Sequence, residues 1–212
     1  MTNLEDALTA VDAGADAVGF VFYEKSPRCV SVETAREICK KVPDSVEKVG
    51  VFVGATPAVA DISGQAGLSL AQIYVHKQAA LTDEFLTHLP CRVIAAISVG
   101  AVGEDELCGL RVSHKVRGHV AAVLIDSGNS EHPGGTGKQF DWHVTADLAR
   151  GLGINLVVAG GLRANNVSKA IEILKPWGVD VATGVEARPG KKDPEKVRAF
   201  VRAVREIDRR TA

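Results

Sequence analysis

The sequence lacks a long apolar run, an excess charge of either sign and a basic cluster. No apolar run approaches about 18 residues, the length expected of a transmembrane helix, and residues 1–8 are polar and acidic. We therefore expect neither a membrane span nor a signal peptide. Lys and Arg number 25 against 26 Asp and Glu, a net charge of −1, whereas nucleic-acid and membrane-surface partners need a cationic face. These absences predict a cytoplasmic protein that acts on a small molecule.

Paired cysteines are also lacking. The four cysteines form no CxxC pair and have no regular spacing with histidine: Cys29, Cys39, Cys91 and Cys108. Structural zinc sites usually show such pairs, so we expect no metal site. Reduced, individually buried thiols are the ordinary alternative in a cytoplasmic protein.

What the chain does contain is an ordinary globular composition, with 212 residues, 46% apolar and 24% charged. This length fits one domain of α/β size, or at most two small ones, and we expect a single domain over residues 1–212.

Short apolar runs alternate with helical patterns along the whole chain. The runs predict seven strands, at residues 17–22, 48–53, 70–75, 93–99, 121–125, 155–159 and 179–182. Helices are predicted near residues 2–13, 32–42, 57–67, 82–89, 104–116, 140–151, 165–174 and 194–208. Thr2, Thr56 and Asp193 are the expected N-caps. The alternation predicts βαβ units and a parallel sheet.

Two folds contain such units: the (β/α)8 or TIM barrel and the doubly wound open sheet. A doubly wound nucleotide binder usually has GxGxxG after its first strand, whereas the glycine pairs of this chain come after its last strands. Phosphate commonly binds after strands seven and eight of a barrel, so the late glycines favour the barrel. The count is one strand short, and the chain opens on a helix.

Asp126 ends the apolar run at residues 121–125 and is soon followed by the glycine-rich segment 133–137. Polar residues at the carboxyl ends of barrel strands face the catalytic mouth. Asp126 is therefore a candidate general acid, with a cap or an ion-pair partner as the alternative. Arg28, in the loop after the first predicted strand, suits a substrate carboxylate or an ordinary surface position.

Three small-residue pairs are candidates for phosphate binding, because glycine lets an anion approach the backbone N–H groups closely. They are Gly134 and Gly135, Gly160 and Gly161, and Thr183 and Gly184. A short helix beginning after Thr183 would add its N-terminus to the site. Tight turns between strand and helix are the alternative interpretation of each pair.

Five segments spread over nearly the whole chain are informative together: EDALTAVDAGADAVGFVFYEKSPRCVS, VEKVGVFV, DSGNSEHPGGTGKQFDW, VVAGGLRANNV and GVDVATGVEARPGKKDPEKVRAFV. In these segments and in their order the chain resembles the phosphoribosylanthranilate isomerase family of tryptophan biosynthesis. The resemblance implies a (β/α)8 barrel of the ribulose-phosphate-binding type. It also implies an isomerase that needs no metal or cofactor. The implied reaction is an Amadori rearrangement of N-(5-phosphoribosyl)anthranilate to 1-(2-carboxyphenylamino)-1-deoxyribulose 5-phosphate.

The resemblance assigns roles to the candidate residues. Asp126 would protonate the furanose ring oxygen, Arg28 would bind the anthranilate carboxylate, and the three small-residue pairs would bind the phosphate. The family's Gln-Leu-His-Gly reads Gln72-Ile73-Tyr74-Val75 here, so only Gln72 is carried over as a further substrate contact.

The family's chains begin with a strand ending Lys-Ile-Cys-Gly, whose cysteine acts as general base. That strand does not precede Met1 in this sequence, so we expect the family's first strand to be missing and the chain as written to be impaired. The alternatives are a non-catalytic phosphosugar-binding barrel and a histidine-pathway or dual-substrate aminoaldose isomerase. Either a monomer or a homodimer is compatible with the sequence.

Overall fold

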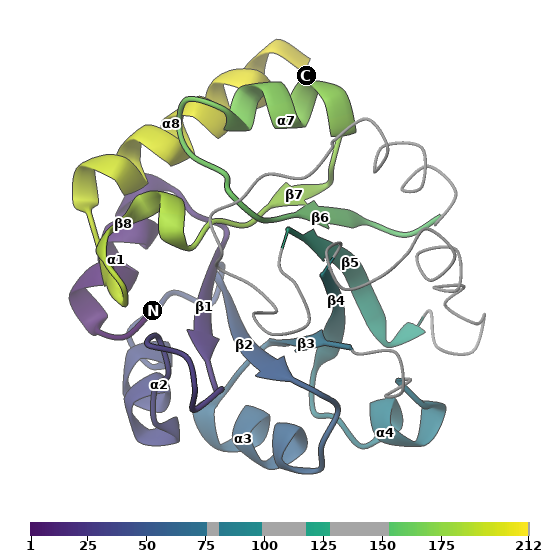
Figure 1. Ribbon diagram of the computed structural model, residues 1–212. Helices are drawn as coiled ribbons and strands as arrows, with labels where there is room; N and C mark the ends of the chain where they lie inside the picture. The colour runs from purple at the N-terminus through teal and green to yellow at the C-terminus, as the bar shows by residue number, and fades with distance from the viewer. Residues whose placement is uncertain (76–80, 99–117, 128–152, 212) are drawn as a thin grey trace.

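The structure is a computed structural model that describes residues 1–75, 81–98, 118–127 and 153–211. Within these residues seven parallel strands form one sheet in the order β1-β2-β3-β4-β5-β6-β7. Their bounds are β1 Ala17–Val21, β2 Glu47–Val53, β3 Leu70–Tyr74, β4 Arg92–Ser98, β5 Val120–Asp126, β6 Leu156–Val158 and β7 Gly178–Val179. The sheet curls around a common interior, with the helices outside it (Figure 1). The predicted fold of the (β/α)8-barrel type is thereby confirmed, with seven strands in the described part.

The helices are α1 Leu4–Ala13, α2 Val32–Cys39, α3 Ala58–Ala66, α4 Asp83–Thr87, α7 Val167–Leu174 and α8 Pro194–Thr211. A short 3-10 helix, η3 (Thr183–Val185), leads into a small hairpin of β8 (Glu186–Arg188) and β9 (Lys191–Lys192). The helix α8 packs beside both α7 and α1 (Figure 1). None of the helices described here is long and apolar enough to cross a membrane. The helices predicted at 104–116 and 140–151 lie outside the described residues.

The strands divide the apolar core into two layers, because successive side chains of a strand point to opposite faces. On β5, Val123 and Ile125 pack in the larger cluster, which also contains buried residues of the helices. Ala122 and Leu124 belong to a second cluster, made almost entirely of strand residues, inside the curl of the sheet. Asp126 continues this even-numbered series, so its side chain belongs to the interior face.

Two of the three predicted N-caps are wrong. Asn3, rather than Thr2, caps α1 by accepting a hydrogen bond from the Asp6 backbone N–H at 2.9 Å. The Thr2 hydroxyl donates to the Gly190 carbonyl instead. Helix α3 follows Pro57 and has no side-chain cap, so Thr56 does not have the predicted role.

The third predicted cap is confirmed, since Asp193 accepts hydrogen bonds from the backbone of Glu195 and Lys196 at 3.0 and 3.2 Å. Of the cysteines, Cys39 is buried, Cys91 is half-buried and Cys29 is exposed, so the expectation of a buried thiol is wrong at Cys29. Cys108 lies outside the described residues.

The last parallel strand is shorter than its apolar pattern predicts. The strand predicted at residues 179–182 is paired only over Gly178–Val179. The Asp180 backbone N–H still donates to the Val158 carbonyl at 2.8 Å, after which the chain turns into η3. This early departure from the sheet leaves Asp180 at the carboxyl ends of the strands.

Candidate active site

Asp126 is buried at the carboxyl end of β5, with 4% of its surface exposed. The Tyr74 hydroxyl, at the end of β3, donates a buried hydrogen bond of 3.0 Å to Asp126 Oδ2. Burial raises the pKa of Tyr74 well above its usual value, and the Asp126 and Asp180 carboxylates raise it further. A hydrogen bond with Gln72 acts in the opposite direction on the Tyr74 pKa. Tyr74 therefore stays protonated at neutral pH and remains a donor.

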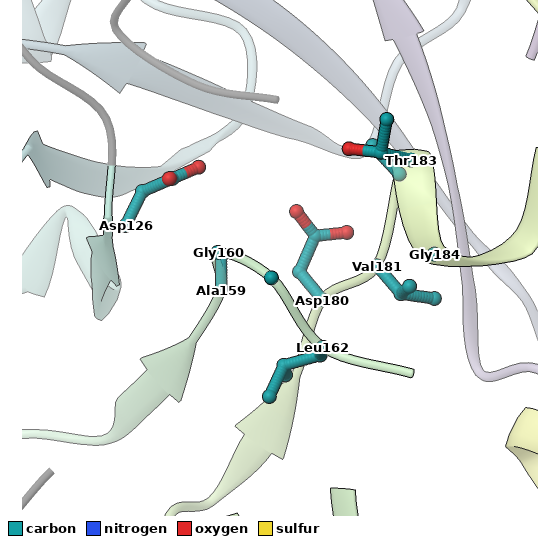
Figure 2. A pocket seen from close by; sticks show the side chains of 10 residues that line it. Asp126, Ala159, Gly160, Leu162, Asp180, Val181, Thr183 and Gly184 are labelled. Atoms are coloured by element: carbon teal, nitrogen blue, oxygen red, sulfur yellow. The ribbon is translucent and has the colours of Figure 1, made fainter. Parts of the chain in front are cut away.

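A pocket of about 270 Å³, which includes space open to solvent, lies at these strand ends. Its lining joins the end of β5, the loop after β6 and the segment after β7: Asp126, Ala159, Gly160, Gly161, Leu162, Asp180, Val181, Ala182, Thr183 and Gly184. Figure 2 shows Asp126 and Asp180 on either side of Gly160, with their carboxylates directed towards the same open space. The structure thus brings the predicted acid together with two of the three predicted phosphate-binding pairs.

The glycines of the pocket also have a packing role. Gly160 and Gly161 have φ angles of 89° and 65°, in the left-handed region that side chains rarely adopt. A Cβ atom on Gly160 would lie 2.6 Å from Ser127 Cβ, and one on Gly184 would overlap the Leu162 carbonyl oxygen. The tight-turn interpretation therefore applies to Gly160 and Gly161, whereas at Gly184 close packing against Leu162 excludes a side chain. Both constraints coexist with an anion-binding role because the same backbone lines the pocket.

Asp180 is a second carboxylate that sequence reasoning missed. Asp180 lines the pocket and is exposed to solvent. Desolvation by the protein around it still raises the pKa of Asp180, while the positive charge of Lys192 and a hydrogen bond from the Val181 backbone act to lower it. The pocket therefore holds two carboxyl groups. The pattern VDVA is typical of a strand, so Asp180 was predicted as a strand residue and not as a site residue.

Arg28 is not part of the pocket lining. Its Nε and Nη2 atoms both donate to the Glu186 carboxylate, each at 2.8 Å. The side chains are 17% and 4% exposed, so the pair is largely shielded from water. Burial acts to raise the pKa of Glu186, but the Arg28 hydrogen bond and the positive charges of Lys192 and Arg28 outweigh it and hold the pKa below its usual value.

Further charged residues connect the Arg28–Glu186 pair with α1. Lys192 Nζ lies 3.5 Å from Glu186 Oε1 and donates to the Ala182 carbonyl at 3.1 Å. Burial lowers the pKa of Lys192, against the opposing effect of the Glu186 and Asp180 carboxylates. Asp6 of α1 accepts hydrogen bonds from Lys191 Nζ at 2.6 Å and from the Lys192 backbone at 2.7 Å. Ion pairs and hydrogen bonds thus join the loop after β1, the β8–β9 hairpin and α1.

The predicted site residues thus fall into three groups. Five lie together in the pocket: Asp126, Gly160, Gly161, Thr183 and Gly184. Gln72, 5% exposed, lies below Tyr74 on the same face of β3, and Arg28 is paired with Glu186. Gly134 and Gly135 lie outside the described residues. Tyr74, Asp180 and Glu186 were not predicted, and the one available signal was Tyr74 at the end of an apolar run.

Comparison with known proteins gives consistent matches over most of the chain. The family model described as N-(5'phosphoribosyl)anthranilate (PRA) isomerase matches residues 1–203. A curated N-(5'-phosphoribosyl)anthranilate isomerase from Pelobacter propionicus is 44% identical over 207 residues, 97% of this chain and 93% of that protein. The expectation that the family's first strand is missing is not supported by these matches, given their high coverage.

Solved structures give the same result. Phosphoribosyl anthranilate isomerase from Thermotoga maritima superposes with a TM-score of 0.82 and 36% identity, covering 97% of this chain and 96% of that one. A phosphoribosyl anthranilate isomerase in complex with reduced 1-(o-carboxyphenylamino)-1-deoxyribulose 5-phosphate superposes with a TM-score of 0.77 and 33% identity, covering 97% and 95%.

Proposed function

The chain belongs to the N-(5'-phosphoribosyl)anthranilate isomerase family, and we propose that Asp126 and the surrounding glycine-lined pocket perform this family's reaction. The protein is an isomerase of tryptophan biosynthesis. It converts N-(5-phosphoribosyl)anthranilate into 1-(2-carboxyphenylamino)-1-deoxyribulose 5-phosphate by an Amadori rearrangement. The observation that carries the site assignment is the buried Asp126 beside the pocket formed by the loops after β6 and β7.

Asp126 is the proposed general acid. Opening the furanose ring breaks a C–O bond, and the ring oxygen must gain a proton as the bond breaks and the nitrogen forms an imine. A carboxyl group 4% exposed can hold and deliver that proton away from bulk water. A base must then remove the proton from the carbon next to the imine, which gives the enol that becomes the ketose product.

The substrate carries an anionic group at each end, and each group has a separate proposed binding site. The backbone at Gly160, Gly161, Thr183 and Gly184 would hold the phosphate, together with Gly134 and Gly135. Arg28 would bind the anthranilate carboxylate, since a guanidinium held by Glu186 through Nε and Nη2 still has donors on Nη1. Gln72 remains a weaker proposed contact, beneath Tyr74.

The cellular setting is also a proposal. A single domain over residues 1–212 acting in the cytoplasm, as a monomer or homodimer, is consistent with a biosynthetic enzyme of small molecules. Sedimentation of the purified protein distinguishes the two oligomeric states.

The test is turnover of N-(5-phosphoribosyl)anthranilate by the purified protein, with the product identified by mass and by its ketose group. The aminoimidazole ribotide substrate of the histidine pathway is assayed in parallel. We expect turnover of the anthranilate substrate. Binding without turnover would contradict the proposal and favour a non-catalytic phosphosugar-binding barrel, and turnover of the ribotide alone would favour a histidine-pathway isomerase.

A further inference from the structure

The hydrogen bond between Tyr74 and Asp126 is a contact that the proposed reaction does not yet use. It is 3.0 Å long, buried, and joins residues 52 positions apart. We propose that Tyr74 is a positioning residue, which holds the Asp126 carboxyl in the orientation for protonating the substrate and determines which of its oxygens carries the transferred proton. This inference rests on the proposed function, and the experiment below separates the failure of one from the failure of the other.

The strand register explains how Tyr74 reaches Asp126. Tyr74 pairs with Ala96 of β4, which pairs with Leu124 of β5, and Asp126 follows two positions later on the same interior face. The Tyr74 side chain on β3 therefore has to reach across β4 to β5, and neighbouring strands lie about 4.8 Å apart. Ala96 carries only a methyl group at this crossing, and it belongs to the same interior cluster as Tyr74. A long side chain on β3 and a small one on β4 together make the contact possible.

The direction of the hydrogen bond determines where the acid proton lies. Tyr74 keeps its proton at neutral pH, because burial and the Asp126 and Asp180 carboxylates raise its pKa. A phenol that donates to Oδ2 leaves no room for a second proton between the same two oxygens at 3.0 Å. As long as Tyr74 is the donor, the protonated form of Asp126 carries its hydrogen on Oδ1. Since Asp126 lines the pocket, Tyr74 prepares a single form of the acid for the substrate.

Other groups near Asp126 define the electrostatic setting. Ser98 of β4 pairs with Asp126 in the sheet and is buried. Asp180, after β7, lines the same pocket, and the charge of Lys192 acts on Asp180 from the hairpin. A negative charge on Asp180 favours the protonated form of Asp126, whereas the hydrogen bond from Tyr74 favours its carboxylate. The hydrogen bond from Tyr74 therefore counteracts the effect of the Asp180 charge, so that Asp126 releases its proton more readily.

The central variant is Tyr74→Phe, which keeps the ring and removes the hydroxyl. Loss of one hydrogen bond to a carboxyl group predicts a fall in kcat of about tenfold, with KM for the anthranilate substrate changed less than about twofold. Because kcat needs protonated Asp126, activity falls as pH rises through the ionisation of this acid. Removing the donor moves that fall to higher pH. A purely structural role for Tyr74 would leave this part of the pH profile in place.

Tyr23→Phe is the matched control, since the chain has only two tyrosines. Its hydroxyl has no assigned part in the site, so kcat and the pH profile should equal those of the parent. The same variant leaves Tyr74 as the single tyrosine, whose ionisation is then followed by ultraviolet titration. In Asp126→Asn, combined with Tyr23→Phe, we expect Tyr74 to ionise at lower pH, because the carboxylate that raises its pKa has gone.

A second measurement covers the case in which Tyr74→Phe does not fold. Fluorotyrosine incorporated into Tyr23→Phe labels only Tyr74 and makes its hydroxyl a stronger donor, so the fall in kcat should move to lower pH. A pH profile unchanged in the fluorotyrosine protein, or turnover and a pH profile unchanged in a folded Tyr74→Phe protein, would overturn the role of Tyr74 alone. Absence of turnover by the parent overturns the proposed function and this inference with it.

Discussion

Two polar residue pairs lie at the carboxyl ends of the strands, and they differ in the charges of their partners. Tyr74 and Asp126 meet inside the curl of the sheet through one hydrogen bond between a neutral donor and an acid. Arg28 and Glu186 meet between the loop after β1 and β8, through two hydrogen bonds between full charges. The first arrangement leaves an acid able to gain and lose a proton, whereas the second keeps both partners charged.

The difference indicates a division of work in the proposed mechanism. A proton donor must change its protonation state during each turnover, so it needs surroundings that tolerate both states. A group that binds an anionic substrate must keep its charge. Arg28, held in place by two hydrogen bonds to Glu186, is the group proposed here.

The first prediction concerns the acid itself. Asp126→Asn keeps the size of the side chain but removes the transferable proton, so we expect kcat to fall about 1000-fold, equivalent to about 4 kcal/mol of barrier. Steady-state turnover of the anthranilate substrate measures it. Asp61→Asn, at an exposed position of α3, is the control and should leave kcat unchanged. A fall of less than tenfold in Asp126→Asn would assign the acid elsewhere.

The second prediction tests the charged pair. Glu186→Gln leaves the largely buried Arg28 without its full counter-charge, and we expect a loss of about 3 kcal/mol in unfolding free energy. Urea unfolding at neutral pH measures the change. Glu37→Gln serves as control, since Glu37 forms only exposed pairs, with Lys40 and Arg36, and should change the unfolding free energy far less. Equal effects of the two variants would contradict the contrast between buried and exposed pairs.

The third prediction tests the close packing around the pocket. Gly160→Ala places a Cβ against Ser127 at a φ of 89°, and we expect a loss of about 2 kcal/mol from strain and overpacking. Gly64→Ala is the matched control, because a Cβ atom at this position of α3 would meet nothing within 4 Å. That variant should stabilise the protein by about 0.5–1 kcal/mol. Thermal unfolding of both variants is the measurement, and a neutral Gly160→Ala would contradict the tight-turn interpretation.

The fourth prediction concerns acid stability. The pKa of Glu186 is lower in the folded protein than its usual value, so its contribution is present above the unfolded pKa and lost as pH falls through the folded one. Glu186→Gln should therefore weaken the pH dependence of unfolding free energy below about pH 4.5, by at most one proton, or about 1.4 kcal/mol per pH unit. Urea titrations at several acidic pH values measure the slope, which Glu37→Gln should change less.

How far the sequence predicts the site depends on the range of each contact. Asp126 and Gly160 could be predicted because a strand pattern and the turn after it are local, and barrel geometry then places the strand ends together. The Tyr74 partner lies 52 residues away and the Arg28 partner 158 residues away. Neither distance leaves a periodic signal, so the sequence indicates only a strand residue at Tyr74, and at Arg28 a residue facing the substrate or the solvent.

The fold was predicted more completely than the ends of its elements. Seven parallel strands follow from the alternation of apolar runs and helical patterns, which every βαβ unit repeats. The errors occur where a competing contact decides: Asn3 caps α1 while Thr2 turns to Gly190, and Asp180 leaves the strand that its apolar neighbours predicted. Such choices depend on residues distant in sequence, which periodicity cannot represent.

The contact between Asp6 of α1 and the Lys192 backbone also has a kinetic meaning, because 186 positions separate the two residues. On the ribosome, α1 is synthesised long before its partner exists, and closing so long a loop is entropically unfavourable until the intervening strands have assembled. The docking of α1 against α8 and the hairpin is therefore a late event of folding. Interactions made late in folding chiefly slow unfolding. We therefore expect the ion pairs of the hairpin to lower the unfolding rate of the native state.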